Sequence, residues 1–520
     1  MYSPQTSGNF KSVGLSRGLP AYSRHFVQAL LRIPLLGGDV FVTELNNTQL
    51  GKPAVPAIPA VPTQEPPSPA AARKKLLLEG AILPTLLRLA VPNVMNLLAF
   101  VGVIIFDGYF LGRIGTSALA GASLAFPFVM MVLHSTNSGM GAGVSSAIAR
   151  AIGAGQTARA QALVLHAFVL ALALGVVFTA FMWLAGPVVF RWMGGRDDVL
   201  SDALSYANIA MGGAVCICVL NLLGNAVRGT GNMRVHAGVL LGCVVAHIAL
   251  SPLLIFGWGP VPSLGSAGAA WSLILPFAVG SLVMIRYLRS GQSSLQLRFR
   301  GIRLQRALFT DILNVGVPSL INMVIMNLSI IVLTGIAGQF GPSAAIGYAM
   351  GARLEYILQP IVFGFGMATV AMVGMNWGAG QYQRARAIAW TGAFLSAGIC
   401  AIIGLVVAIW PHLWVGLFSS DAEVLRIGSL YLQTVGPVYG CFGLALGLVF
   451  ACQGYGRGYE AMVANAARLI VNAVGAFAAA YWLGFGLTGF CVAVAFGFVF
   501  YAAVLCRSLQ QIKDPVVKGQ

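Results

Sequence analysis

The stretch LLRLAVPNVMNLLAFVGVIIFDGYFLG, residues 86–112, decides the fold. No charged residue lies between Arg88 and Asp107, and about 20 consecutive apolar residues cross the hydrocarbon core of a bilayer. Asp107 precedes Arg113, which we take as the outer end of the helix, so its carboxylate lies roughly 9 Å inside that end. An ionisable side chain at that depth is costly and predicts a functional site. The alternative is an interfacial aspartate that reaches water.

The composition identifies the class of protein. Hydrophobic residues make up 58% of the chain, charged residues 9%, and the mean hydropathy is +0.84. Soluble proteins carry about 25% charged residues, so this chain is predicted to be a polytopic membrane protein. Its net charge of +17 is therefore interpreted as a topology signal, since cytoplasmic loops carry the excess of Lys and Arg. We expect no nucleic-acid partner.

The sequence contains no motif for a metal site or for catalysis. All eight cysteines lie within apolar runs or at their ends, none forms a CxxC pair, and no zinc-ligand spacing is present. The HExxH motif is also missing from the sequence, and no two carboxylates are paired within a predicted span. We therefore expect a protein that is not an enzyme and binds no cofactor.

The first 75 residues differ from the rest of the chain. A Pro-rich linker, residues 53–69, follows a start that is poor in acids and contains Arg and Ser. Such a linker is extended and does not pack, so residues 1–75 are predicted to form a disordered arm. An organellar transit peptide, a cytosolic arm or a misplaced start codon would each explain it. The membrane would be organellar in the first case.

Twelve apolar spans follow the arm. They cover residues 85–112, 118–147, 161–186, 202–227, 236–257, 266–287, 312–337, 343–372, 388–411, 424–451, 461–483 and 487–507. With both termini in the cytoplasm, thirteen Arg residues, Arg228 among them, fall in inner loops and four in outer loops, which favours that orientation. We predict an N-lobe at 76–290, an Arg-rich linker at 291–310, a C-lobe at 311–507 and a cytoplasmic tail at 508–520.

The two lobes repeat each other in sequence. GRIGTSALAG at 112–121 aligns with GQFGPSAAIG at 338–347 at an offset of 226, and GAGQTARA at 153–160 aligns with GAGQYQRA at 378–385 at an offset of 225. Because each lobe has six spans, an even number, both lobes begin on the same side of the membrane and have the same orientation. The predicted fold is all-α, with two six-helix lobes related by a pseudo-two-fold axis along the membrane normal and substrate bound between them.

The doubled pattern, D-x-x-x-x-G-R-I-G followed by GAGQxxRA, resembles the multidrug and toxic compound extrusion (MATE) family, and its DinF-like branch in particular. The resemblance covers about residues 80–507; the N-terminal arm lies outside the family's pattern. It implies a V-shaped, twelve-helix, cation-coupled antiporter.

Asp107 is the main candidate for the coupling site. Only Asp107 and Glu355 lie well within a span, and the position equivalent to Asp107 in the second lobe is Leu333. Because the repeat is apolar there, the fold does not require an acid at 107. His247, Ser251 and Ser272 are predicted to lie at a similar depth.

The resemblance to the DinF-like branch also implies which residues surround Asp107, and this chain differs from that branch in the fifth span. The DinF-like branch commonly carries N-x-x-x-D-P in the fifth span, where this chain has His247-Ile-Ala-Leu-Ser251-Pro252. Its threonine in span six corresponds to Ser272 and an asparagine in span four to Asn221. Loss of an amide and a carboxylate weakens a Na⁺ site, whereas imidazole beside carboxylate exchanges protons. We therefore expect H⁺ coupling, with Na⁺ as the alternative; His247 bonded to a helix carbonyl is the structural alternative.

Other residues within the spans are assigned either a structural role or a place in the substrate cavity. Glu355 is expected to pair structurally with Arg353 or a polar neighbour, and Pro92 and Pro318, equivalent in the repeat, are candidate bends. The predicted substrate-cavity residues are Asn137, Asn322, Met326, Tyr348, Tyr356 and Gln359.

These features predict a monomeric antiporter of the bacterial inner membrane. It would export amphipathic, cationic drugs or metabolites in exchange for H⁺, with protonation of Asp107 as the coupling event. A flippase for lipids or lipid-linked oligosaccharides is the alternative. A flippase would require a basic central cavity, whereas the Arg residues here lie mostly in predicted loops.

Overall fold

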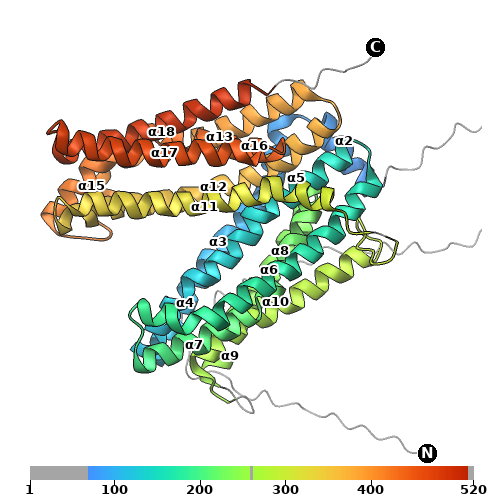
Figure 1. The fold of residues 1–520 in the computed structure, drawn as a ribbon, viewed down its shortest axis with the longest axis horizontal. Helices are drawn as coiled ribbons and strands as arrows, with labels where there is room; N and C mark the ends of the chain where they lie inside the picture. Colours follow the sequence, from blue (N-terminus) through green and yellow to red (C-terminus); the bar gives the residue numbers. More distant parts are fainter. Residues whose placement is uncertain (1–67, 258–261, 302, 513–520) are drawn as a thin grey trace, which may run out of the picture. The chain divides into compact units, whose positions relative to one another are not determined.

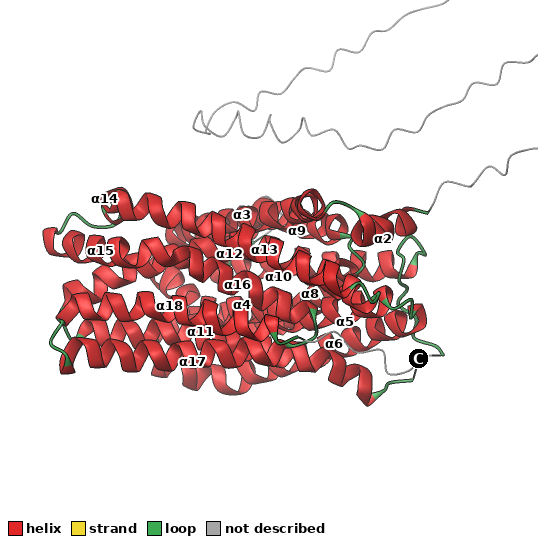
Figure 2. Cartoon of the chain, turned by 90° about the horizontal axis from the view of Figure 1, so that it is seen from above, coloured by secondary structure: helices red, strands yellow, loops and turns green. Residues whose placement is uncertain are grey.

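The computed structural model describes residues 68–257, 262–301 and 303–512, and every regular element in these ranges is helical (Figure 2). Most of the arm predicted at 1–75 lies outside them. The first half of the chain contains α2 (Pro69–Glu79), α3 (Ile82–Ile114), α4 (Thr116–His134), η1 (Ser135–Gly139), α5 (Met140–Gly153), α6 (Thr157–Trp192), α7 (Asp197–Gly212), α8 (Ala214–Gly229), α9 (Met233–Phe256) and α10 (Gly265–Arg289). The second contains α11 (Arg306–Gly338), α12 (Pro342–Gly378), α13 (Tyr382–Ile409), α14 (Pro411–Val415), α15 (Ala422–Val435), η2 (Gly436–Val438), α16 (Tyr439–Gly454), α17 (Gly458–Phe477), η3 (Ala478–Trp482) and α18 (Gly486–Gln510).

Most of these helices are long and apolar enough to cross a bilayer. In the described residues ten pass by length and composition, and the pair α7 and α8, bent by 42°, makes an eleventh. The helix α3, which contains the opening stretch, has 33 residues. The chain is thus an all-helical integral membrane protein, as the composition predicted.

The α-helices pack as two groups. One large apolar core is built mainly by residues of α4–α10, and a second by residues of α11–α18. We call α3–α10 the first half and α11–α18 the second half. In Figure 1 the helices of each half run side by side.

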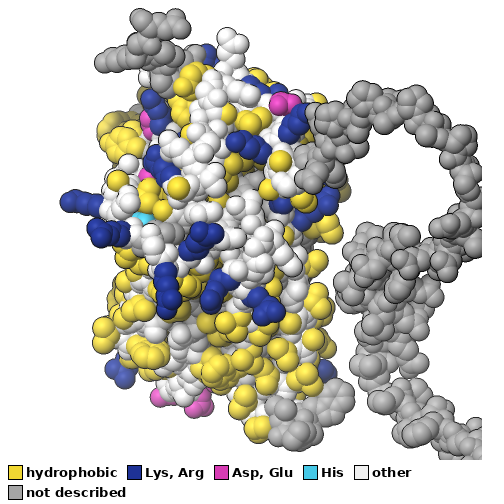
Figure 3. Space-filling model, turned by 90° about the vertical axis from the view of Figure 1, so that its right-hand side faces the viewer, with side chains coloured by type: hydrophobic (Ala, Val, Ile, Leu, Met, Phe, Trp, Pro, Cys, Tyr) yellow, Lys and Arg dark blue, Asp and Glu magenta, His cyan; other side chains and the backbone are white. Residues whose placement is uncertain are grey.

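Contacts between the halves are closest at the end that carries α2. A Cβ atom at Gly153 would lie 2.0 Å from the carbonyl oxygen of Met375, and one at Gly378 would lie 2.1 Å from that of Arg150. Glycine at both positions therefore lets the backbones touch. At the opposite end α7 and α15 are far apart in Figure 1. Lys and Arg side chains gather over the α2 end (Figure 3).

The short helix α2 belongs to this contact region. The Ser68 hydroxyl caps it by accepting from the Ala71 N–H at 3.3 Å, and Leu77 is only 1% exposed. Asn376 donates to the Leu77 carbonyl at 3.0 Å, and Arg384 donates to that of Gly80. The boundary predicted at residue 75 therefore falls within a packed helix, because its Leu run supplies an apolar face to the bundle.

Candidate functional site

Asp107 lies on α3 and faces α9. Its Oδ1 is 2.9 Å from Nε2 of His247, whose side chain is 2% exposed, whereas that of Asp107 is 21% exposed. The two residues were predicted to lie at one depth, and the packing of α3 against α9 brings their side chains into contact. The pair combines a half-buried carboxylate with a buried imidazole.

Two serines extend this cluster as expected. The Ser251 hydroxyl, one turn along α9 from His247, donates to Oδ1 of Asp107 at 3.5 Å. It also lies 3.3 Å from the hydroxyl of Ser272 on α10, which donates to the Ala269 carbonyl at 2.7 Å. Tyr206 on α7 lies within electrostatic range of Asp107, and no pattern in the sequence indicated this neighbour.

The cluster holds one acid and one imidazole. Among the described residues no group of three or more His, Cys, Asp or Glu side chains could hold a metal ion. The His247 ring also lies close to the backbone of Ser272 on α10, and its described side-chain partner is Asp107. Such a pair can hold and exchange one proton between two adjacent sites.

Asn221 belongs to a different cluster. Its side-chain amide donates to the Thr136 hydroxyl at 2.9 Å, and its carbonyl accepts from Asn225 at 2.9 Å. Asn225 also donates to the Asn137 carbonyl at 3.0 Å. Nη1 of Arg228 donates to Oδ1 of Asn137 at 2.8 Å. We call Thr136, Asn137, Asn221, Asn225 and Arg228 the arginine cluster.

Arg228 was assigned to an inner loop from the sequence, and that placement is wrong. It lies in the last turn of α8 and is 3% exposed. The helix extends two residues beyond the predicted span, to Gly229, and the long side chain reaches Asn137 in the π-helical turn η1.

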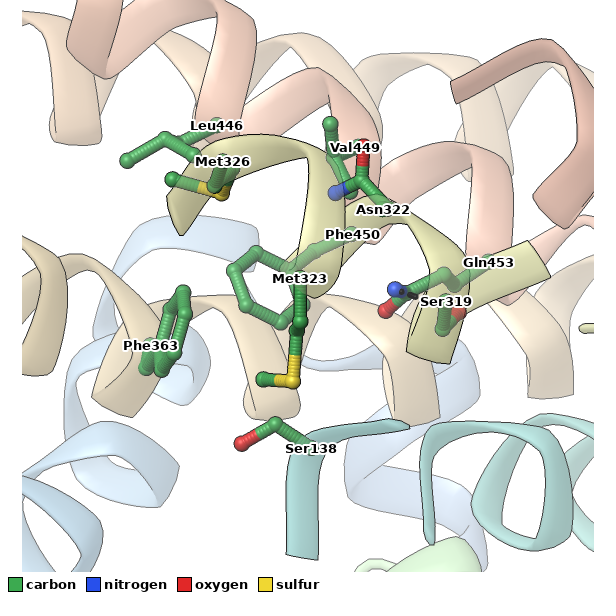
Figure 4. Close-up of a pocket in the computed structure, with 10 residues that line it drawn as sticks. All are labelled: Ser138, Ser319, Asn322, Met323, Met326, Phe363, Leu446, Val449, Phe450 and Gln453. Carbon is green, nitrogen blue, oxygen red and sulfur yellow. Dashed lines mark hydrogen bonds between the residues drawn. The ribbon is translucent and has the colours of Figure 1, made fainter. Parts of the chain in front are cut away.

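A small pocket lies between the halves near η1 (Figure 4). Its free volume is about 20 Å³, roughly the space of one water molecule. Asn322 and Met326, both predicted cavity residues, line it, and Ser138 contributes from the first half. The remaining lining residues are Ser319, Met323, Phe363, Leu446, Val449, Phe450 and Gln453.

The other predicted cavity residues lie elsewhere. The ring of Tyr348 packs edge-on against Tyr431 with centroids 5.3 Å apart, and it is 2% exposed. Tyr356 is 48% exposed and donates to Asn327 at 3.3 Å. Gln359 is half-buried on α12. Asn137 is half-buried next to the pocket residue Ser138.

Glu355 is held by a polar neighbour rather than by Arg353. The Tyr431 hydroxyl donates to its Oε1 at 3.2 Å, and the glutamate is 5% exposed. The guanidinium of Arg353 instead lies 5.1 Å from the ring centroid of Phe418. Pro92 and Pro318 lie inside α3 and α11.

An ion-pair cluster at the α2 end was missed from the sequence. Asp311 on α11 accepts from Arg150 of α5 at 2.6 Å and from Arg159 of α6 at 2.9 Å. The Ser146 hydroxyl of α5 donates to the Gln453 carbonyl of α16. Acids are common at the ends of spans, so the sequence alone does not indicate that Asp311 has a partner. The pairing becomes visible only when α11 is packed against α5 and α6. We call Arg150, Arg159 and Asp311 the inter-half ion pair.

Both halves of the chain match one known protein family. The sequence model of the MatE family matches residues 92–253 and again 318–478. The chain is 27% identical over 400 residues to a protein of Shewanella oneidensis named FAD transporter, covering 76% of this chain and 87% of that one. It is also 27% identical over 335 residues to the probable multidrug resistance protein YoeA of Bacillus subtilis, covering 64% and 72%.

Solved structures share the fold. A MATE protein in a bent conformation superposes with a TM-score of 0.77 at 23% identity, covering 84% of this chain and 96% of that one. A MOP superfamily transporter of Pyrococcus furiosus, described as having a binding pocket of reverse polarity, gives a TM-score of 0.74 at 25% identity over the same shares.

Proposed function

The chain belongs to the MATE family of transporters and is not an enzyme, and on that premise we propose that it is an antiporter exporting amphipathic compounds in exchange for H⁺. Relatives named as multidrug resistance proteins and as an FAD transporter support an amphipathic organic substrate. We further propose that the protein has twelve spans in two six-helix lobes and belongs to the DinF-like branch. We also propose that it is a monomer in a bacterial plasma membrane.

The orientation follows from the surface charge. Lys and Arg gather at the α2 end (Figure 3), and cytoplasmic ends carry such an excess, so we place both termini in the cytoplasm. The halves then touch on the cytoplasmic side, through Gly153 and Gly378, and separate on the outer side. This arrangement is the outward-facing state of an alternating-access cycle.

The contact between Asp107 and His247 carries the proposal of H⁺ coupling. An acid within an apolar span is a functional feature by default, and this one has an imidazole 2.9 Å away. Na⁺ is a hard cation that prefers several oxygen ligands. Here Asp107, Ser251 and Ser272 supply oxygens, but the imidazole occupies one side of the carboxylate.

The coupling step is a change in the charge of this pair. With Asp107 ionised, the carboxylate accepts from His247 and Ser251 and draws α9 to α3. Protonation from the outside weakens both bonds, because charge-assisted hydrogen bonds are about twice as strong as neutral ones. The helix α3 is then free to bend near Pro92, which shifts the population toward the other state.

Transport into proteoliposomes tests the coupling ion. Purified protein is reconstituted, and uptake of ethidium and of flavin mononucleotide is followed under an imposed pH gradient or an imposed Na⁺ gradient. We expect the pH gradient to drive transport and Asp107→Asn to abolish the driven component, since asparagine keeps the shape but does not titrate. Asp202→Asn is the matched control, because Asp202 on α7 accepts from Ser266 at 2.8 Å, outside the cluster.

Two results would contradict the proposal. One is normal transport by Asp107→Asn under the pH gradient, which would make Asp107 structural and Glu355 the next candidate. The other is strong transport driven by Na⁺ with no pH difference.

The lining of the pocket bears on the charge of the substrate. The cationic charge expected from the family resemblance would call for an acid at the pocket, but none of its ten lining residues is acidic. The arginine cluster beside the pocket instead carries the positive charge of Arg228.

A further inference from the structure

We propose that the arginine cluster recognises an anionic group, a phosphate or a carboxylate, on the exported amphipathic compound; this rests on the proposed transport function and names its substrate class. The apolar part of the same compound would lie against the second half, in the pocket of Figure 4 when it widens.

The first observation is a buried charge without a counter-ion. Arg228 is 3% exposed, and no acid among the described residues lies within 4.0 Å of its guanidinium. Its described partners are neutral amide oxygens, Asn137 at 2.8 Å and Asn225 at 3.4 Å. Nε has no partner at all. Because a buried cation is normally paired, Arg228 lacks the charged acceptor that such a group usually has.

The surroundings add no negative charge. Asn221, Asn225 and Thr136 bond to one another, and His236 of α9 packs directly over Gly224, where a Cβ would lie 1.6 Å from Nδ1. Both ring nitrogens of His236 are buried without a partner. His236 lies within electrostatic range of Arg228, so the cation of the cluster has an imidazole with unpaired nitrogens near it and no described negative charge.

The internal repeat relates this cluster to the pocket. At the offset of 225, Ser138, Asn221, Asn225 and Arg228 correspond to Phe363, Leu446, Phe450 and Gln453, all four of which line the pocket. The first half thus presents serine, amides and a cation where the second presents two phenylalanines, a leucine and a glutamine. Equivalent walls of opposite polarity suit a molecule with one charged and one apolar end.

Asn137 connects the cluster to the space between the halves. It lies in η1, is half-buried, and immediately precedes the pocket residue Ser138. A π-helical turn of this kind is frequent at functional sites. A carboxylate or phosphate would compete with the Asn137 side chain for Arg228, because charged acceptors form the stronger hydrogen bonds.

Equilibrium binding to the full chain in lipid nanodiscs tests the proposal without any ion gradient. The probes are flavin mononucleotide and riboflavin, which share one ring system and differ by a phosphate; their fluorescence reports binding. We expect flavin mononucleotide to bind the unaltered protein about tenfold more tightly or better, as one charge-assisted contact provides. Because no gradient is used, failed coupling at Asp107 would leave this preference intact.

The variants separate charge from structure. Arg228→Gln introduces the side chain found at the equivalent position 453 and should remove the preference while riboflavin binding stays unchanged. Arg228→Lys should keep part of it. Arg468→Gln, which removes the buried guanidinium bonded to Asn465 in the second half, should not alter it.

Equal binding of the two flavins, binding of neither, an unchanged preference in Arg228→Gln, or loss of both flavins in that variant would overturn the proposal. A second set of nanodiscs with phosphatidylglycerol added to phosphatidylcholine distinguishes the source of the anionic group. A preference that persists supports a soluble substrate. A preference that vanishes there overturns it in favour of a lipid headgroup.

Discussion

Replacing Asp311 by asparagine tests whether the inter-half ion pair holds the cytoplasmic ends together. The substitution keeps the shape of the side chain and removes the charge that Arg150 and Arg159 share. Asp311 lies on α11 of the second half, and both arginines lie on the first half. These contacts can therefore exist only while the halves meet at the α2 end, so their loss should favour inward opening.

The burial of each side chain sets the magnitude. Arg159 is 46% exposed, and a half-exposed pair contributes at most about 1 kcal/mol. The side chains of Arg150 and Asp311 are 17% and 21% exposed, and a hydrogen bond between charged groups contributes about 1.5–3 kcal/mol. A loss of about 2 kcal/mol in total shifts the equilibrium between closed and open cytoplasmic ends by about 30-fold.

Hydrogen–deuterium exchange of the turns at 153–156 and 378–381 measures this shift. Backbone exchange there should become about 10- to 30-fold faster in Asp311→Asn, with a smaller increase in Arg159→Gln. Glu423→Gln is the matched control, because it removes an exposed pair with Arg426 that lies within α15. Unchanged exchange in Asp311→Asn, or equal acceleration by Glu423→Gln, would refute the role of the ion pair.

Two further predictions concern the coupling pair and the N-terminal segment. His247→Asn should preserve export under a pH gradient but shift the pH optimum of uptake, because Asp107 loses its imidazole neighbour; an unchanged optimum would assign the proton to Asp107 alone. Deleting residues 1–67 should leave the unfolding temperature unchanged, whereas Leu77→Ala should lower it by several degrees, since cutting back a fully buried leucine costs about 2–5 kcal/mol. Equal stability of Leu77→Ala and the unaltered protein would contradict the packing of α2.

Much of the fold was readable because hydrophobic length and periodicity are local properties. The apolar stretch at 86–112 lies within α3, and the GAGQ segments that were aligned as repeats begin at equivalent places, the last residues of α5 and α12. Depth within the membrane likewise predicted that His247, Ser251 and Ser272 lie near the level of Asp107. His247 and Ser251 also share a face, because they are one turn apart on one helix. These predictions needed no knowledge of which helices touch.

The errors arose where a side chain reaches another helix. Asn221 matched a pattern for the Asp107 site, but its direction on α8 points it at Thr136. Arg228 looked like a loop residue because it stands beside the Gly229-Thr-Gly turn, yet its long side chain extends into the protein interior. Glu355 is not one of these errors, because Tyr431 is a polar neighbour of the kind expected for it; the other expected partner, Arg353, is two residues away on the same helix and points in a different direction.

The reciprocal contact at the α2 end also bears on how such a chain arose. Gly153 touches the backbone at Met375, and Gly378 touches it at Arg150, and both partners correspond at the offset of 225. One patch meeting its own equivalent is the mark of an isologous dimer interface. A half-length protein would pair with itself through this surface, and fusion of two copies would free positions 150 and 375 to differ, as Arg150 and Met375 do in this chain.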